Sequence, residues 1–104
     1  MNNLITLTDP HSPAAEAYQS LRTNIDFAGL DKSLTTLLVT AADDSADKSV
    51  ALANLAVVMA QTGDSVIVVD GDLRRPRQHE IFGVSNQAGL STWIGEDGEP
   101  PLQA

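Results

Sequence analysis

The apolar positions of the first third of the chain follow a helical period. Within residues 13–27 they are spaced i, i+3 and i+7, which predicts an amphipathic helix with one narrow apolar face. Ser12 and Pro13 are typical of a helix N-cap and of the first helical position. Residues 1–12 are polar and rich in turn formers, so we expect them to form an N-terminal extension.

The middle of the chain changes to short runs that are apolar at successive positions. Residues 37–40 and 65–69 are two such runs, and the Ala-, Leu- and Val-rich segment between them predicts a helix over residues 48–61. A strand, helix and strand of this length form a right-handed crossover with parallel strands. Strands without alternation are typical of a parallel sheet covered on both faces. We therefore expect an α/β fold, with further short helices at 78–82 and 90–94.

Composition and charge exclude several classes of function. The 104 residues carry a net charge of −8 and no cysteine, which argues against a nucleic-acid partner, a disulfide framework and a thiolate metal site. The N-terminus lacks the pattern of a signal peptide, and no apolar run reaches the roughly 20 residues that cross a bilayer. These features predict a cytoplasmic protein of one small domain, or part of a larger one.

Two segments carry candidate chemistry. The loop before residue 48 leads from a strand into a helix, which is the natural place for an anion, and Lys48-Ser49 has the spacing that ends a phosphate-binding loop. Asp70 and Asp72 follow the second strand and suit magnesium. The plainer alternatives are a helix turn with a solvated lysine and a strand-end turn with solvated acids. Three interpretations stay open for the basic run at residues 74–77: it binds phosphate, it binds the acids of a neighbour, or it is solvated.

Several motifs in this order resemble the bacterial tyrosine kinases of capsule and exopolysaccharide export, over roughly residues 12–95. The residues that carry the resemblance are Ser12-Pro13, Glu16-Ala17-Tyr18, Leu21-Arg22-Thr23-Asn24, Leu37-Leu38-Val39-Thr40, Lys48-Ser49, Asn54-Leu55-Ala56, Val69-Asp70-Gly71-Asp72-Leu73-Arg74-Arg75-Pro76, Phe82-Gly83 and Gly89-Leu90-Ser91.

The resemblance implies a three-layer P-loop fold with a parallel sheet, of the deviant-Walker ATPase type. Such kinases transfer the γ-phosphate of ATP to tyrosines of their own tail, with Mg²⁺. Residues 13–95 would be the N-terminal part of that domain, and residues 96–104 a polar tail at which the domain is truncated. By position, the implied catalytic residues are Lys48, Asp70 and Asp72, the nucleotide-binding residues Ala46, Asp47, Lys48, Ser49 and Val50, and the magnesium ligands Ser49, Asp70 and Asp72.

The resemblance also implies partners. The first long helix of the family carries a Glu-x-x-Arg-x-x-Arg pattern used in ring assembly, which here is Glu16, Gln19 and Arg22, without the middle arginine. Glu16 and Arg22 are therefore the predicted interface residues of a homo-oligomer. A membrane-embedded chain-length regulator is the second implied partner, and it would hold the protein at the inner face of the cell membrane.

The phosphate loop departs from the family pattern Ala-x-Pro-Gly-Glu-Gly-Lys-Ser-Thr, because this chain has neither loop glycine nor the proline. Asp47 precedes the lysine and would repel a phosphate about 4 Å away by roughly 1 kcal/mol in water and about 4 kcal/mol at an effective dielectric constant near 20. We therefore expect weakened ATP binding. Tyr18 is the only tyrosine, so this chain alone is not expected to phosphorylate its own tail.

Three functional hypotheses follow from the sequence. The first is the ATP-dependent tyrosine kinase of polysaccharide export. The second is a nucleotide-free pseudokinase that serves as a scaffold on the membrane regulator, which the loss of the loop glycines favours. The third is a positioning ATPase of the partitioning type, against which the kinase-like motifs argue.

Overall fold

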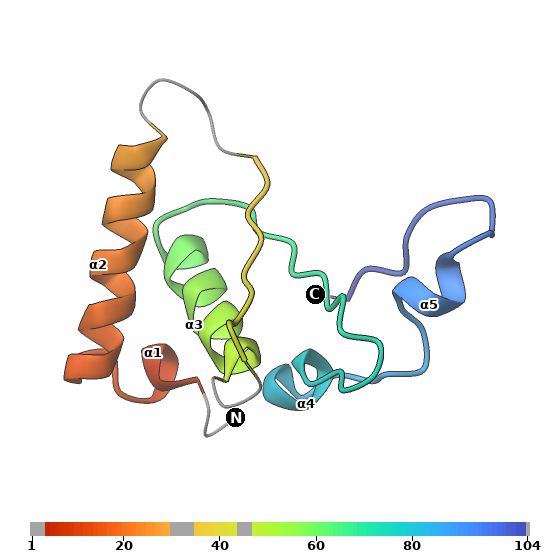
Figure 1. The fold of residues 1–104 in the computed structure, drawn as a ribbon, viewed down its shortest axis with the longest axis horizontal. Coiled ribbons are helices and arrows are strands. Elements are labelled where there is room, and N and C mark those ends of the chain that lie inside the picture. Colours follow the sequence, from red (N-terminus) through yellow and green to blue (C-terminus); the bar gives the residue numbers. More distant parts are fainter. Residues whose placement is uncertain (1–3, 30–34, 44–46, 104) are drawn as a thin grey trace.

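The computed structural model describes residues 4–29, 35–43 and 47–103, and Figure 1 shows their arrangement. Within these ranges the secondary structure is helical. The helices are α1 (Ile5–Thr8), α2 (Pro13–Ala28), α3 (Lys48–Gln61), α4 (Gln78–Phe82) and α5 (Leu90–Trp93). No helix among these residues has the length and hydropathy that crossing a bilayer requires.

Helix α2 begins where the sequence predicts. The Ser12 side chain accepts a hydrogen bond from the Ala15 N–H at 3.2 Å, and Pro13 is the first helical residue. Ala15 is fully buried, so the start of the helix is held by packing as well as by its cap. The predicted helix over residues 13–27 is confirmed.

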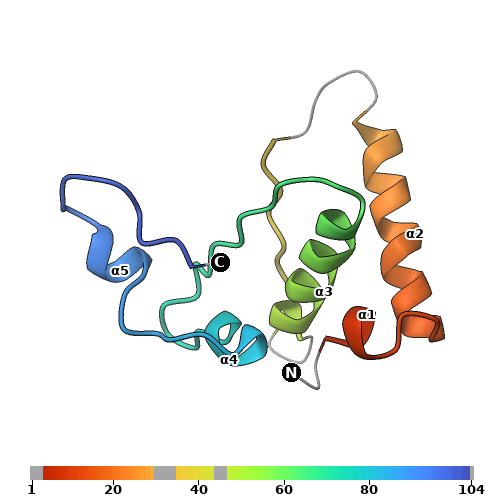
Figure 2. The ribbon, with the colours of Figure 1, turned by 180° about the vertical axis from the view of Figure 1, so that it is seen from behind.

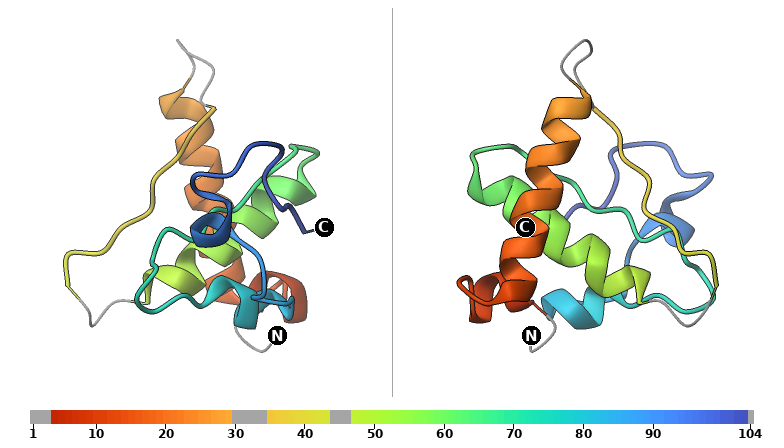
Figure 3. Two further views of the ribbon diagram at one scale, coloured as in Figure 1. Left: turned by 90° about the vertical axis from the view of Figure 1, so that its right-hand side faces the viewer. Right: turned by 60° about the vertical axis from the view of Figure 1, so that its left-hand side comes forward.

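Helix α3 is the centre of the structure, because α1, α2 and α4 all pack on it. Helix α2 crosses it, and α1 and α4 lie on either side of its N-terminal half (Figures 2 and 3). Five consecutive or near-consecutive residues of α3, between Ala53 and Val58, are buried. The predicted helix over residues 48–61 is confirmed, and its nearly uniform apolar character is explained by neighbours on several sides.

The core joins the segment before α1 to α3 and α4. Leu4, Ala53 and Ile81 form its buried cluster, and each is at most 2% exposed. Leu4 precedes α1 and Ile81 belongs to α4, so α3 connects segments that are almost 80 positions apart in the chain. Helix α5 packs on no other helix among the described residues, and Figure 1 shows it beyond α4.

Helix α1 was not predicted, since residues 1–12 are polar and turn-rich. Its Thr6 is 1% exposed and is held by the buried side chain of Asn54 on α3. Asn54 Oδ1 accepts hydrogen bonds from the Thr6 N–H at 3.1 Å and from Thr6 Oγ1 at 2.8 Å. Leu4 and Thr6 of the N-terminal segment are therefore part of the buried interior.

The predicted parallel strands at 37–40 and 65–69 are not formed in the part of the chain that the structure describes. Both segments run extended beside α3, as the yellow and green traces of Figure 1, without a β-ladder. In the described ranges the ladder is missing because each of the two segments is covered on one side only. Leu38 is 85% exposed and Ile67 is 66% exposed, whereas parallel strands are typical of sheets that are covered on both faces.

Candidate functional site

The start of α3 and the turn after the second extended segment form the candidate site. Lys48 is the first residue of α3, and its Nζ lies 3.3 Å from Asp72 Oδ2. The two residues are 24 positions apart, and it is the path of the chain through α3 and back that brings them together. The structure thus places the predicted phosphate-loop lysine beside one of the two predicted magnesium ligands.

Asp70 organises the turn and the start of α4. Its Oδ1 accepts a hydrogen bond from the Asp72 N–H at 3.1 Å, and its Oδ2 accepts from the N–H groups of Arg77 and Gln78, both at 3.0 Å. A carboxylate at the start of a helix satisfies backbone donors that have no partner within the helix. Both oxygens of this predicted magnesium ligand therefore bind backbone groups of the chain itself.

Asp72 has two partners within the site. Its Oδ1 accepts a hydrogen bond from the Arg75 N–H at 3.1 Å, and its Oδ2 faces Lys48. The Arg75 N–H, followed by the Lys48 ammonium group, lowers the pKa of the Asp72 carboxyl below its usual range. Asp72 is therefore ionised at neutral pH, and it neutralises the cation that would otherwise face a phosphate.

Asp47 caps α3. Its Oδ1 accepts a hydrogen bond from the Val50 N–H at 3.2 Å, and its Oδ2 lies 2.8 Å from Arg77 Nη1. The hydrogen bond from Arg77, followed by the one from Val50, lowers the pKa of the Asp47 carboxyl. The residue that was predicted to repel phosphate thus has a second role, since it stabilises the helix N-terminus.

Two side chains of this network do not belong to the predicted site residues. Arg77 contacts Asp47, and Gln78 donates from Nε2 to the Ser49 carbonyl at 2.9 Å. Arg77 belongs to a basic run that the sequence marks as a candidate partner for acids, whereas Gln78 carries no signal in the sequence. Together they tie the start of α4 to the start of α3.

In this arrangement a triphosphate would meet donors that are already engaged by carboxylates of the chain. The Val50 N–H, which a phosphate would need, points at Asp47, and the Lys48 ammonium group pairs with Asp72. Across the described ranges no three or more His, Cys, Asp or Glu side chains come together in a way that could hold a metal ion. Ala46, the first predicted nucleotide-binding residue, lies outside those ranges.

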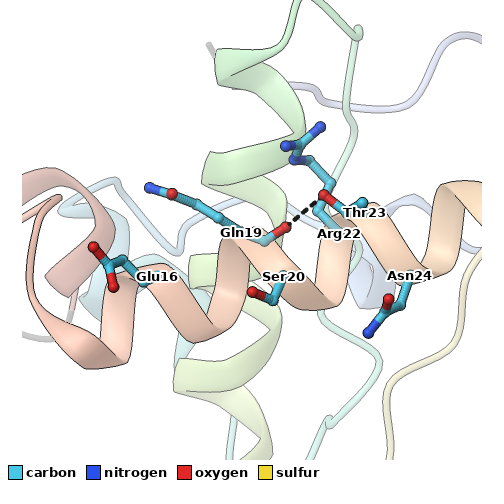
Figure 4. Close-up of a pocket in the computed structure, with 6 residues that line it drawn as sticks. All are labelled: Glu16, Gln19, Ser20, Arg22, Thr23 and Asn24. Atoms are coloured by element: carbon cyan, nitrogen blue, oxygen red, sulfur yellow. Dashed lines mark hydrogen bonds between the residues drawn. The ribbon is translucent and has the colours of Figure 1, made fainter.

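The predicted oligomer residues lie on a separate surface. Glu16, Gln19 and Arg22 follow one another on successive turns of α2 and line one shallow hollow, which Figure 4 shows together with Ser20, Thr23 and Asn24. Arg22 Nη1 lies 3.7 Å from Asp26 Oδ2, and its buried Nε has no hydrogen-bond partner among the residues that the structure describes. This polar hollow is distinct from the site at the start of α3.

The chain is similar to several known proteins. It is 42% identical over 90 residues to tyrosine-protein kinase YwqD of Bacillus subtilis strain 168, with 86% of the chain and 38% of that protein covered. It is 36% identical over 94 residues to tyrosine-protein kinase Etk of Escherichia coli strain K12, with 89% of the chain and 13% of that protein covered. No protein-family model matches the chain.

The fold has a solved counterpart as well. The crystal structure of the chimerical protein CapA2B2 superimposes with a TM-score of 0.84 at 40% sequence identity, over 90% of this chain and 41% of that one. The chain thus spans less than half the length of each of these three proteins.

Proposed function

The chain belongs to the bacterial tyrosine-kinase family, and from this premise we propose that it acts as a protein-tyrosine autokinase-like component of capsule and exopolysaccharide biosynthesis and export. The observation that carries the proposal is the meeting of Lys48, at the start of α3, with Asp72, after the second extended segment. In a P-loop fold these two positions flank the nucleotide phosphates.

The cofactors that the family implies are ATP and Mg²⁺. Lys48 and Ser49 stand at the phosphate-binding positions, and Ser49, Asp70 and Asp72 stand at the magnesium positions. Because Asp47 and Asp72 engage the donors of this site, we expect the chain to bind ATP weakly. Weak binding is compatible with activity, since Michaelis constants of enzymes reach about 1 mM.

The proposal includes the rest of a three-layer domain. In a complete domain, residues 37–40 and 65–69 would pair as parallel strands, and a further layer would cover their outer face. The exposure of Leu38 and Ile67 supports this, because such apolar side chains are normally buried in a parallel sheet.

We also propose two partners. Glu16 and Arg22 would contact neighbouring copies in a homo-oligomeric ring, and the polar hollow of α2 supports a contact of this charged kind. A membrane-embedded chain-length regulator would hold the protein at the inner face of the membrane. Exchange of Glu16 for lysine should then lower the molar mass measured by light scattering, whereas an unchanged mass would argue against this interface.

A second candidate function is a nucleotide-free scaffold. The specific observation in its favour is that the Val50 N–H at the start of α3 binds the Asp47 carboxylate of the chain itself, which Arg77 also contacts. A scaffold would keep the α2 surface and the membrane partner and would have no need of a phosphate site.

One assay separates the two functions. The full chain is incubated with millimolar Mg-ATP and a tyrosine-containing copolymer as acceptor, since Tyr18 is its only tyrosine. A kinase gives phosphotyrosine that disappears in the Lys48→Ala variant. Absence of any Lys48-dependent phosphorylation and of Lys48-dependent ATP binding at these concentrations overturns the kinase proposal and supports the scaffold.

A further inference from the structure

The N-terminus of α3 already holds an anion. The Val50 N–H donates to Asp47 Oδ1 at 3.2 Å, and the Ala51 N–H donates to the Asp47 carbonyl at 3.2 Å. The first N–H groups of a helix have no partner within the helix, and with the positive end of the helix dipole they attract negative charge. The same groups bind phosphate in phosphate loops. The Ala51 bond is the first one within the helix, whereas the Val50 N–H is taken by the Asp47 carboxylate, which competes there directly with a phosphate.

Arg77 fixes this carboxylate in place. Its Nη1 donates to Asp47 Oδ2 at 2.8 Å, the length of a charge-assisted hydrogen bond. The backbone of Arg77 is itself fixed, since its N–H donates to Asp70 Oδ2 at 3.0 Å. The contact therefore joins the first turn of α3 to the turn that carries the second acidic motif.

The ion pair of Asp47 and Arg77 is formed, and both of its side chains are in part exposed to solvent. The side chains of Asp47 and Arg77 are 51% and 37% exposed, so water and solutes reach both of them. Ion pairs at this exposure contribute little to stability. An incoming polyphosphate can thus replace the carboxylate without disrupting the core.

We propose that Asp47 is an internal anion that occupies the phosphate position at the N-terminus of α3, held there by Arg77, so that a triphosphate binds only by displacing it. This inference rests on the proposed function in one respect, namely that the segment before Lys48 is a phosphate-loop position. It adds a specific cause for weak ATP binding, namely the Asp47 carboxylate, which a single substitution removes.

The test is calorimetric titration of the full chain with Mg-ATP and, as a probe without a base, with inorganic tripolyphosphate. Asp47→Asn keeps a side chain that caps helices and removes the charge, and Asp47→Gly restores the residue type of the family loop. The matched control is Asp64→Gly, which removes one exposed acid just beyond α3. Circular dichroism verifies that each variant is folded.

Both Asp47 variants are expected to bind each probe at least tenfold more tightly than the wild type, while Asp64→Gly stays within twofold. A tenfold change corresponds to about 1.4 kcal/mol. The gain should vanish in the double variant Asp47→Gly/Lys48→Ala, because Lys48 is the cation of the opened site. Equal affinities of the Asp47 variants and Asp64→Gly overturn the inference, as does tight binding by the wild type.

This outcome is separable from that of the kinase proposal. If Asp47→Gly binds ATP more tightly and still forms no phosphotyrosine, the internal anion is supported and the kinase activity is refuted. If the wild type phosphorylates the copolymer while the Asp47 variants gain no affinity, the kinase is supported and the internal anion is refuted.

Discussion

Replacement of Asn54 by alanine should lower the free energy of unfolding, because it removes the hydrogen bonds that hold the N-terminal segment on α3. Asn54 is fully buried on α3, and its Oδ1 accepts two hydrogen bonds from Thr6, one from the N–H at 3.1 Å and one from Oγ1 at 2.8 Å. In Asn54→Ala both Thr6 donors lose this acceptor at a site that water does not reach. A buried donor without a partner costs about 1–3 kcal/mol.

The expected loss in the free energy of unfolding of Asn54→Ala follows from the cost of these two unpaired donors. Two donors give about 2–6 kcal/mol, the Thr6 hydroxyl relieves part of this by rotating, and the higher helix propensity of alanine returns roughly 0.5 kcal/mol, which leaves about 1–4 kcal/mol. Small domains have free energies of unfolding of about 5–15 kcal/mol, so the variant should remain folded but show a clearly lower urea midpoint.

The measurement is urea unfolding followed by circular dichroism, with Asn24→Ala as the matched control. Asn24 is an exposed residue of α2, and its replacement should change the free energy of unfolding by less than about 0.5 kcal/mol. In a Thr6→Val background the cost of Asn54→Ala should shrink, because one of the two donors is already gone. Equal losses for Asn54→Ala and Asn24→Ala would refute the reasoning.

Two further predictions concern packing and pH. Ile81→Ala removes a side chain that is 1% exposed and should lower the free energy of unfolding by about 2–5 kcal/mol, whereas Ile67→Ala, at a position 66% exposed, should have little effect in the same urea titration. The folded-state pKa of Asp47 is lowered, so its contribution is present above the unfolded-state pKa of about 4 and is lost as the pH falls through the folded-state value. The stability difference between wild type and Asp47→Asn, at most about 1 kcal/mol for a half-exposed group, should therefore be seen at pH 7 and disappear in acid; a difference that grows in acid would contradict this sign.

Helices α2 and α3 were predictable because their signals are local. The Ser12 cap, Pro13 and the apolar spacing lie within or next to the helix that they specify. Helix α1 was missed for the opposite reason. Its four residues show no helical period, and what holds them is the hydrogen bonding of Thr6 to a residue 48 positions away.

The extended segments show how an apolar run can mislead. Residues 37–40 and 65–69 have the β-branched and leucine-rich composition of buried strands, and yet they run as extended segments without a β-ladder. A parallel ladder also depends on what covers its second face, and that depends on other parts of a fold rather than on the strand itself.

The sequence pointed to single residues of the candidate site but not to all of the side-chain contacts that link them. The spacing of motifs identified Lys48 and Asp72, because the ends of a strand–helix–strand unit meet on one edge whatever the loops contain. The contact of Asp47 with Arg77 joins residues 30 positions apart through side-chain geometry, which the sequence does not encode in any spacing.

Asp47 shows how a residue that weakens phosphate binding by the loop can at the same time stabilise the fold. Glycine before the lysine lets the backbone approach a phosphate, and as a helix N-cap it is only a few tenths of a kcal/mol poorer than aspartate. Aspartate supplies the cap oxygen and a charge for Arg77, so the substitution Asp47→Gly should slightly lower the free energy of unfolding while it raises the affinity for polyphosphate. Opposite signs of these two changes in one variant are what an internal anion requires, because the Val50 N–H serves either the carboxylate or the ligand. A general loosening of the loop would instead lower both stability and affinity.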